Sequence, residues 1–165
     1  MPPISRYSTL DLRIARCSGR YRMPLLGGTA LEVLSDLYGV PAPRPRSVND
    51  LDFLHIEGHS HPLESFDAYL QRLGLSRGRG ELADPYIGYT GQDPAGQPIE
   101  VDVLRTYEAN LADAILLHQD LAVLTPQAQI RMKRQRLSQP LPGTPPERLA
   151  LDRADITWLK TLRSW

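Results

Sequence analysis

The sequence predicts a single α/β domain of the α+β type, in which a small mixed sheet carries flanking helices and a C-terminal helical segment. Three observations support this fold class. Apolar and polar residues alternate at 50–53 and again at 99–103, which is the period of a half-buried strand. Apolar residues at positions 30, 31, 33, 34 and 37 lie on one face of a helix. After residue 106 the pattern becomes helical, so we expect all of the strands before this point and only helices after it.

The composition fits one globular domain with no strong electrostatic partner. The 165 residues are 41% hydrophobic, enough for a core, and 19 basic residues balance 19 acidic ones, which does not indicate a nucleic-acid or membrane partner. No apolar run reaches the ~20 residues that span a bilayer, and the first residues lack the apolar core of a signal peptide. The single cysteine, Cys17, excludes an intrachain disulfide. We therefore expect a cytoplasmic protein that does not contact membranes.

The expected elements follow from hydrophobic spacing and from the glycines and prolines that separate the periodic segments. In chain order they are a short helix near 8–17, a buried strand at 23–28, a helix at 29–39, a loop at 40–49, a strand at 50–56, an amphipathic helix at 61–75, a hairpin of strands at 86–91 and 97–106, and helices at 107–119, 125–137 and 146–165. We divide the chain into a core at 1–120 and a helical extension at 121–165 that packs on it.

Acidic residues occupy alternate positions in two of the expected strands. Because side chains alternate across a strand, Asp50 and Asp52 point to the same face, ~7 Å apart. Glu100 and Asp102 share one face of a later strand in the same way. Carboxylates that converge from two strands can bind divalent cations such as Mg²⁺. The alternative is a solvated edge face without a ligand, and the strand spacing alone favours neither interpretation.

Two glycines and a threonine mark the junction between the strand at 23–28 and the helix that follows. Gly27 and Gly28 allow positive φ angles and close backbone approach, and Thr29 stands where the helix begins. Free amides and the helix dipole favour an anion such as a phosphate there. Taken alone, the turn is better explained as a plain strand–helix junction with Thr29 as the N-cap.

The order of these features resembles the nucleotidyltransferase superfamily, which has the DNA polymerase β-like fold. A strand, Gly-Gly-Thr, a helix, a loop, a strand with Asp-x-Asp and a later strand with a third acid follow one another over residues 20–105. More narrowly, GGTALEVL, the arginine Arg46, DLDF and VDVL look like motifs of the AbiEii-type toxin family. IRMKRQRL and LDRADITWLKTL resemble two helices of that family, one bearing a lysine and one an aspartate.

The resemblance implies a metal-dependent enzyme that moves a nucleoside monophosphate from an NTP to an acceptor hydroxyl. It implies that Asp50, Asp52 and Asp102 are the catalytic acids and the ligands of Mg²⁺ or Mn²⁺. Asp155 is implied as a secondary site residue. The nucleotide-binding residues that it implies are Gly27, Gly28, Thr29, Arg46, Ser47 and Lys133.

The partners of such a protein are expected from the same resemblance. The acceptor would be RNA, a protein or a small molecule, and a toxin would have a cognate antitoxin. The apolar residues of the last helix are compatible with a homodimer.

A non-catalytic protein is the alternative to an enzyme. The family usually has Thr or Ser shortly before Asp-x-Asp, whereas Val48 stands at that place here and Ser47 is displaced by one residue. This difference favours a module that retains the fold and binds a nucleotide or a partner. The repulsion among three idle carboxylates argues against it. A structural partner in a toxin–antitoxin pair is a third class.

Overall fold

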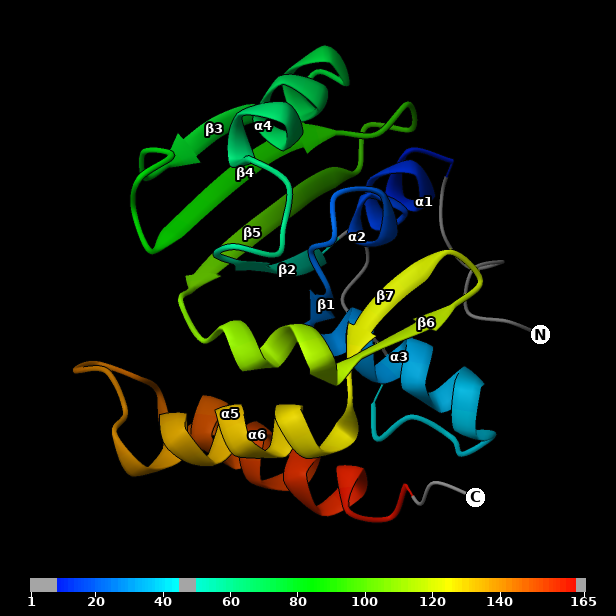
Figure 1. Cartoon of the computed structure of the whole chain (residues 1–165), viewed down its shortest axis with the longest axis vertical. Helices are drawn as coiled ribbons and strands as arrows, with labels where there is room; N and C mark the ends of the chain where they lie inside the picture. Colours follow the sequence, from blue (N-terminus) through cyan, green and yellow to red (C-terminus); the bar gives the residue numbers. More distant parts are fainter. Residues whose placement is uncertain (1–8, 45–49, 163–165) are drawn as a thin grey trace.

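A mixed seven-stranded sheet forms the centre of the molecule in the computed structural model, which describes residues 9–44 and 50–162 (Figure 1). The strand order across the sheet is β3-β4-β5-β2-β1-β7-β6. The strands are β1 (Leu25–Leu26), β2 (Asp50–Ile56), β3 (Ser76–Arg79), β4 (Tyr86–Gln92), β5 (Pro98–Thr106), β6 (Ile115–His118) and β7 (Leu121–Leu124). The helices are α1 (Thr9–Ala15), α2 (Cys17–Arg20), α3 (Gly27–Tyr38), α4 (Leu63–Arg72), α5 (Pro126–Ser138), α6 (Pro146–Leu159) and the 3₁₀ helix η2 (Ala109–Ala114). This architecture confirms the predicted fold class.

Strand β2 is held on both of its edges. It pairs antiparallel with β1 and parallel with β5, and β1 in turn pairs parallel with β7. Leu51 and Phe53 of β2 are fully buried on one face of the sheet, and Leu54 and Ile56, further along the strand, are fully buried on the other face. A strand fixed in this way holds its polar side chains at defined positions.

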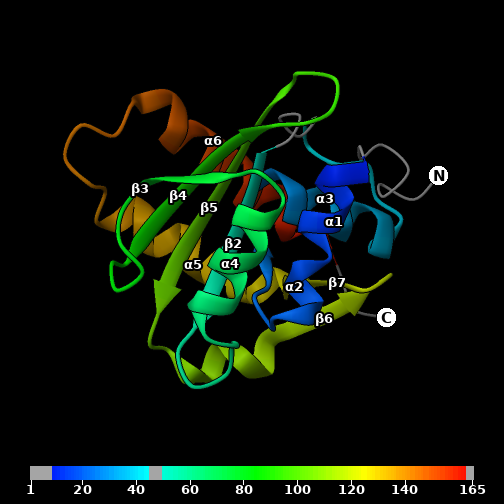
Figure 2. The same cartoon turned by 90° about the horizontal axis from the view of Figure 1, so that it is seen from above.

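Helices cover both faces of the sheet, with α4, α1 and α2 on one side and α5 and α6 on the other (Figure 2). On the first side, the ring of Phe66 from α4 lies 5.2 Å from that of Phe53 and 6.2 Å from that of Tyr89. On the second side, a smaller apolar cluster joins β2 to η2, β7 and α5 through Leu54, Ile56, Leu111, Leu124 and Ala128. None of the described helices combines the length and the apolar character that a membrane-spanning helix requires.

Most of the expected elements are confirmed. The helix expected at 29–39 is α3, and Gly39 ends it with a φ of 68°. The hairpin expected at 86–106 is formed by β4 and β5, which pair antiparallel over the whole length of β4. The two helices expected near the end of the chain are α5 and α6.

The helix predicted at 107–119 is wrong. Residues 109–114 form the 3₁₀ helix η2, and the chain then runs through β6, turns at Gln119 and Asp120, and returns as β7. Both turn residues have positive φ angles, 50° and 66°, as a two-residue type I′ hairpin turn requires. The apolar run at 115–118 fits a helix or a strand by spacing alone. Pairing decides between them, because β7 gains β1 as a second partner and is buried throughout.

The proposed division of the chain at residue 120 falls between β6 and β7, which are two strands of one hairpin. Since β7 also pairs with β1, it is part of the central sheet, and the helical segment begins with α5 at Pro126 instead of at residue 121. The description of this segment as a separate extension of a core stays a prediction.

Candidate active site

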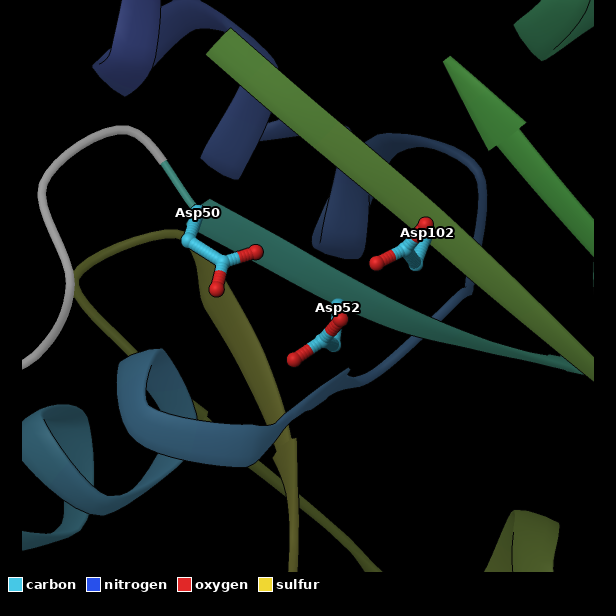
Figure 3. A group of neighbouring side chains, drawn as sticks. All are labelled: Asp50, Asp52 and Asp102. Atoms are coloured by element: carbon cyan, nitrogen blue, oxygen red, sulfur yellow. The ribbon is translucent and has the colours of Figure 1, made fainter. Parts of the chain in front are cut away.

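Three aspartates converge on one face of the sheet (Figure 3). Further along β2, the same face packs against α5. Asp52 of β2 and Asp102 of β5 are register partners in a parallel pair, so their side chains leave the sheet next to each other. Asp50 lies two residues before Asp52 on the same face. One carboxylate oxygen from each of the three lies within 4.8 Å of the other two. Glu100, the register partner of Asp50, is exposed and lies outside this cluster.

The main chain at Gly27 lies directly against Asp52. Leu26 is the register partner of Asp52, and α3 begins at the next residue. Gly27 has a φ of 63°, and a Cβ atom built on it would lie 2.3 Å from the Asp52 Oδ2 atom. Any other residue would therefore be strained by the backbone here and would displace the Asp52 carboxylate. The N-terminus of α3, with its positive dipole end, thus lies beside the three acids.

The other predicted residues of this turn have distinct surroundings. The Thr29 hydroxyl donates to the main-chain oxygen of Asp50 at 2.9 Å, and the Thr29 side chain is buried. This bond ties the first turn of α3 to the first residue of β2, whereas the N-cap position is occupied by Leu26. Gly28 is the second residue of α3. Arg46 and Ser47, like Val48, lie outside the described residues, so their assignment stays a prediction.

The three carboxylates destabilise one another's charge. Burial, together with the charges of Asp50 and Asp102, raises the pKa of Asp52 from 3.8 to about 7. The charges of Arg148 and Arg136 act in the opposite direction. These two arginines belong to α6 and α5, so the C-terminal helices bring positive charge within electrostatic reach of the acids. Full ionisation of the cluster at neutral pH calls for additional positive charge.

The donor set suits a hard divalent cation. Mg²⁺ and Mn²⁺ prefer carboxylate oxygens, and the cluster consists of three carboxylates without histidine or cysteine. Two such ions in a phosphoryl-transfer site lie ~3.5–4 Å apart. Oxygens that all lie within 4.8 Å of one another can serve one ion or bridge two. Among the residues that the structure describes, no other set of at least three histidine, cysteine, aspartate or glutamate side chains is close enough to do so.

Asp102 has two further neighbours that we did not identify from the sequence. The Arg79 Nη2 atom lies 3.3 Å from Asp102 Oδ1 and 3.3 Å from the Tyr86 hydroxyl. The same guanidinium lies over the Tyr86 ring, 5.3 Å from its centroid. Burial and a hydrogen bond to Asp102 raise the pKa of Tyr86 to about 12. Their proximity depends on the pairing of β3, β4 and β5, which no local pattern reveals.

Lys133 lies in a network of ion pairs between α5 and α6. Its Nζ atom is 3.1 Å from Asp155 Oδ2 and 3.7 Å from Asp152 Oδ1. Asp152 also accepts a 2.7 Å hydrogen bond from Arg136 Nε, and Asp155 pairs with Arg44. Burial alone would raise the pKa of Asp152, but the bond from Arg136 and the neighbouring positive charges outweigh it and lower that pKa. The structure therefore brings the predicted Lys133 and Asp155 together as an ion pair.

Comparison with known proteins extends this description at the level of fold. No protein-family model and no curated protein matches the sequence. An antigenic nucleotidyltransferase-like protein from Paracoccidioides brasiliensis is 16% identical, with a TM-score of 0.51 over 94% of this chain and 78% of that one. The antibiotic-resistance factor ANT(2'')-Ia is 12% identical, with a TM-score of 0.53 over 99% of this chain and 91% of its own.

A third structure is less similar. A chain from the complex between the Type VI effector Tas1 and its immunity protein has a TM-score of 0.39, which is too low to relate the folds. At the identities of the first two, the likeness concerns the fold alone. The chain therefore has the fold of the nucleotidyltransferase-like proteins.

Proposed function

We propose that this protein is a metal-dependent nucleotidyltransferase, which transfers a nucleoside monophosphate from an NTP to an acceptor hydroxyl. The observation that carries the proposal is the convergence of Asp50, Asp52 and Asp102 beside the main chain at Gly27. The shared fold with nucleotidyltransferase-like proteins supports it. A solvated edge face does not account for three carboxylates that converge from two adjacent strands beside a glycine with a positive φ.

The three aspartates are the residues that would hold Mg²⁺ or Mn²⁺. When bound, such ions neutralise the charge of the triphosphate and of the leaving pyrophosphate. The raised pKa of Asp52 supports this role, because it reflects a site with an excess of negative charge.

We place the triphosphate against the turn formed by Gly27, Gly28 and Thr29. Amide groups at the start of α3 and the dipole of that helix attract phosphate oxygens, and the main chain at Gly27 lies beside the Asp52 carboxylate that would hold the metal. Arg46 and Ser47, just before β2, belong to the same proposed nucleotide site.

The helices α5 and α6 supply positive charge to this site. The charge of Arg136 acts on Asp52, so this arginine is placed to neutralise a bound phosphate. Lys133 contributes indirectly, because it shares the carboxylate of Asp152 with Arg136 and helps to hold α5 against α6. Asp155 has the same positioning role through Lys133.

Asp102 is the residue that we assign to the acceptor. It lies one strand further from α3 than Asp52, so the acceptor would approach from the side of β4. Its carboxylate receives the proton of the acceptor hydroxyl, the hydroxyl oxygen forms a bond to the α-phosphorus, and the bond to the pyrophosphate breaks in line. Catalysis of this kind depends mainly on positioning and on neutralisation of charge.

A narrower assignment to the AbiEii-type toxins rests on the sequence motifs. It would make the acceptor RNA, a protein or a small molecule, and it would add a cognate antitoxin as a partner.

Cys17 is buried, and burial raises the pKa of its thiol to about 12, so this residue is not a nucleophile. A reducing cytoplasm as the place of action fits this single buried thiol.

The test is transfer of label from each α-labelled NTP in the presence of Mg²⁺ and total cell extract. Label in RNA, protein or small molecules identifies the acceptor class. Asp50→Asn and Asp52→Asn should each lower the rate by about a hundredfold or more, because charge neutralisation is the main catalytic contribution. Glu100→Gln is the matched control, since this acid lies on the same face but outside the cluster.

The outcome distinguishes an enzyme from a binding module. Equal labelling by the wild type and by both aspartate variants would overturn the proposed mechanism. Absence of transfer together with NTP binding would favour the non-catalytic module.

A further inference from the structure

We propose that Arg79 is an internal counterion of the acidic cluster. In the metal-free protein Arg79 forms an ion pair with the Asp102 carboxylate, and this ion pair breaks when a divalent cation binds. This inference rests on the metal site of the proposed function and adds to it a residue that competes for one of the ligands. Three observations support the inference: the path by which the Arg79 side chain reaches Asp102, the weakness of their contact, and the second contact that the guanidinium makes.

The path crosses a strand at a glycine. Arg79 belongs to β3 and Asp102 to β5, and β4 lies between them. Gly88 of β4 is the register partner of both residues. A Cβ atom on Gly88 would lie 3.1 Å from Arg79 Nε and 3.2 Å from Asp102 Oδ1, closer than side chains normally pack. Since Gly88 is not among the glycines with positive φ, its backbone does not need glycine. The space left by the missing side chain is what allows Arg79 to cross β4.

The contact itself is suited to exchange. Its distance of 3.3 Å exceeds the ~2.7–2.9 Å of a strong charge-assisted hydrogen bond. The Arg79 side chain is 65% exposed, whereas that of Asp102 is 18% exposed. An ion pair with one partner in water contributes little stability, so its loss costs little. A doubly charged ion that contacts three carboxylates interacts with them more strongly than one guanidinium that contacts a single oxygen.

Arg79 has a second partner beside the cluster, Tyr86, which remains when Asp102 is released. Its guanidinium already lies over the Tyr86 ring and donates to the Tyr86 hydroxyl. This cation–π contact with an exposed ring does not involve Asp102, so it remains when the ion pair is lost. Tyr86 therefore keeps the displaced side chain close to the acids.

The experiment measures the dissociation constant of Mn²⁺ by isothermal titration calorimetry at constant ionic strength, without nucleotide. Arg79→Met should bind Mn²⁺ about two- to fivefold more tightly than the wild type, which is the value of an exposed ion pair expressed as an equilibrium constant. The matched control is Arg77→Met. Arg77 is on the same strand but pairs with Asp67 and Glu81, at 3.3 and 3.5 Å, so the control removes the same charge without touching Asp102.

A second variant separates contact from charge. Gly88→Ala keeps the net charge and places a methyl group between Arg79 and Asp102, so it should also tighten Mn²⁺ binding. Equal or weaker binding by Arg79→Met, relative to Arg77→Met, would overturn the inference and leave the metal site intact. Absence of Mn²⁺ binding by the wild type and by Arg79→Met alike would overturn the metal site and the inference together.

Discussion

Asp52 is the aspartate of the candidate site whose side chain is most closely surrounded. Its carboxylate lies between two other acids and against the main chain at Gly27, and burial withdraws it from water. The native state therefore binds a proton at Asp52 more tightly than the unfolded chain does. A carboxyl group with a raised native pKa destabilises the fold wherever it must ionise.

The pH dependence of stability should report this residue directly. In a metal chelator, the Asp52 contribution to the free energy of unfolding should fall as the pH rises from 3.8 to about 7, the interval between its ordinary and native pKa values. Asp52→Asn should remove this contribution and stabilise the metal-free protein near pH 8 by about 1–3 kcal/mol. Urea denaturation of both proteins at pH 5 and pH 8 measures the effect. The same pH dependence in both would contradict it.

Gly27 allows a second prediction at this scale. Gly27→Ala should cost about 2–4 kcal/mol and abolish metal binding, because the new methyl group meets a carboxylate oxygen at a positive φ. Gly39→Ala is the control. Gly39 has a similar φ of 68° but open space around it, so only the backbone term of about 1 kcal/mol applies. Urea denaturation and Mn²⁺ titration compare the two, and equal losses of stability with metal binding retained would contradict this account.

Residues of the acidic cluster can be predicted from the sequence only where the alternation of side chains along a strand determines which face of the sheet they lie on. Asp50, Asp52 and Asp102 could be placed on common faces because strand residues alternate, and the structure brings the three together. Arg79 and Tyr86 could not be identified in this way, because their position beside Asp102 depends on which strands pair.

Helices α5 and α6 behave as one element because charged groups join them. Lys133 and Arg136 of α5 share the carboxylate of Asp152 on α6, and both Asp152 and Lys133 are buried. Removal of one partner from such a network leaves another charge buried without compensation.

Asp152→Asn should therefore destabilise the protein by about 2–4 kcal/mol. It should also reduce NTP affinity, since Arg136 loses the group that holds it. Glu147→Gln, at an exposed position in the first turn of α6, should cost less than about 1 kcal/mol. Urea denaturation ranks the two variants. A smaller loss for Asp152→Asn than for Glu147→Gln would show that the network does not hold the helices together.

Helices and strands could be predicted from the sequence where the spacing of apolar residues agreed with the positions of glycine and proline. They were missed where only the pairing of strands defines the element. Gly39 and Gly74 end helices as expected. The hairpin of β6 and β7 was missed because Gln119 and Asp120 are not the glycine or asparagine that usually mark a type I′ turn. β3 was missed because its sequence, SRGR, has no apolar residue, so it is recognisable only by its pairing with β4.

At the scale of the whole molecule, the candidate site is assembled from distant parts of the chain. The start of α3, the strands β2 and β5, and the arginines of α5 and α6 all contribute to it. A ligand that binds this assembled site binds the native state alone, so it should stabilise the entire fold.

Mg²⁺ and an NTP together should raise the melting temperature more than either alone. At about a hundred times the dissociation constant the gain is ~2.7 kcal/mol, which corresponds to about 5–10 °C for a domain of this size. Differential scanning fluorimetry with each NTP measures it. Asp50→Asn should abolish the joint shift and Glu100→Gln should retain it. No shift with any NTP would favour a module that binds another partner.

Strand β1 has only two residues, yet both of its edges are paired, one with β2 and the other with β7. During synthesis, its second edge has no partner until Leu121–Leu124 leave the ribosome, long after the Asp-x-Asp strand has emerged. Because this pairing joins residues far apart in the sequence, we expect it to form late, with the acid-bearing strand assembled before its support is complete. The nascent chain would then hold the Asp-x-Asp strand in a partly open sheet until most of the polypeptide has been made.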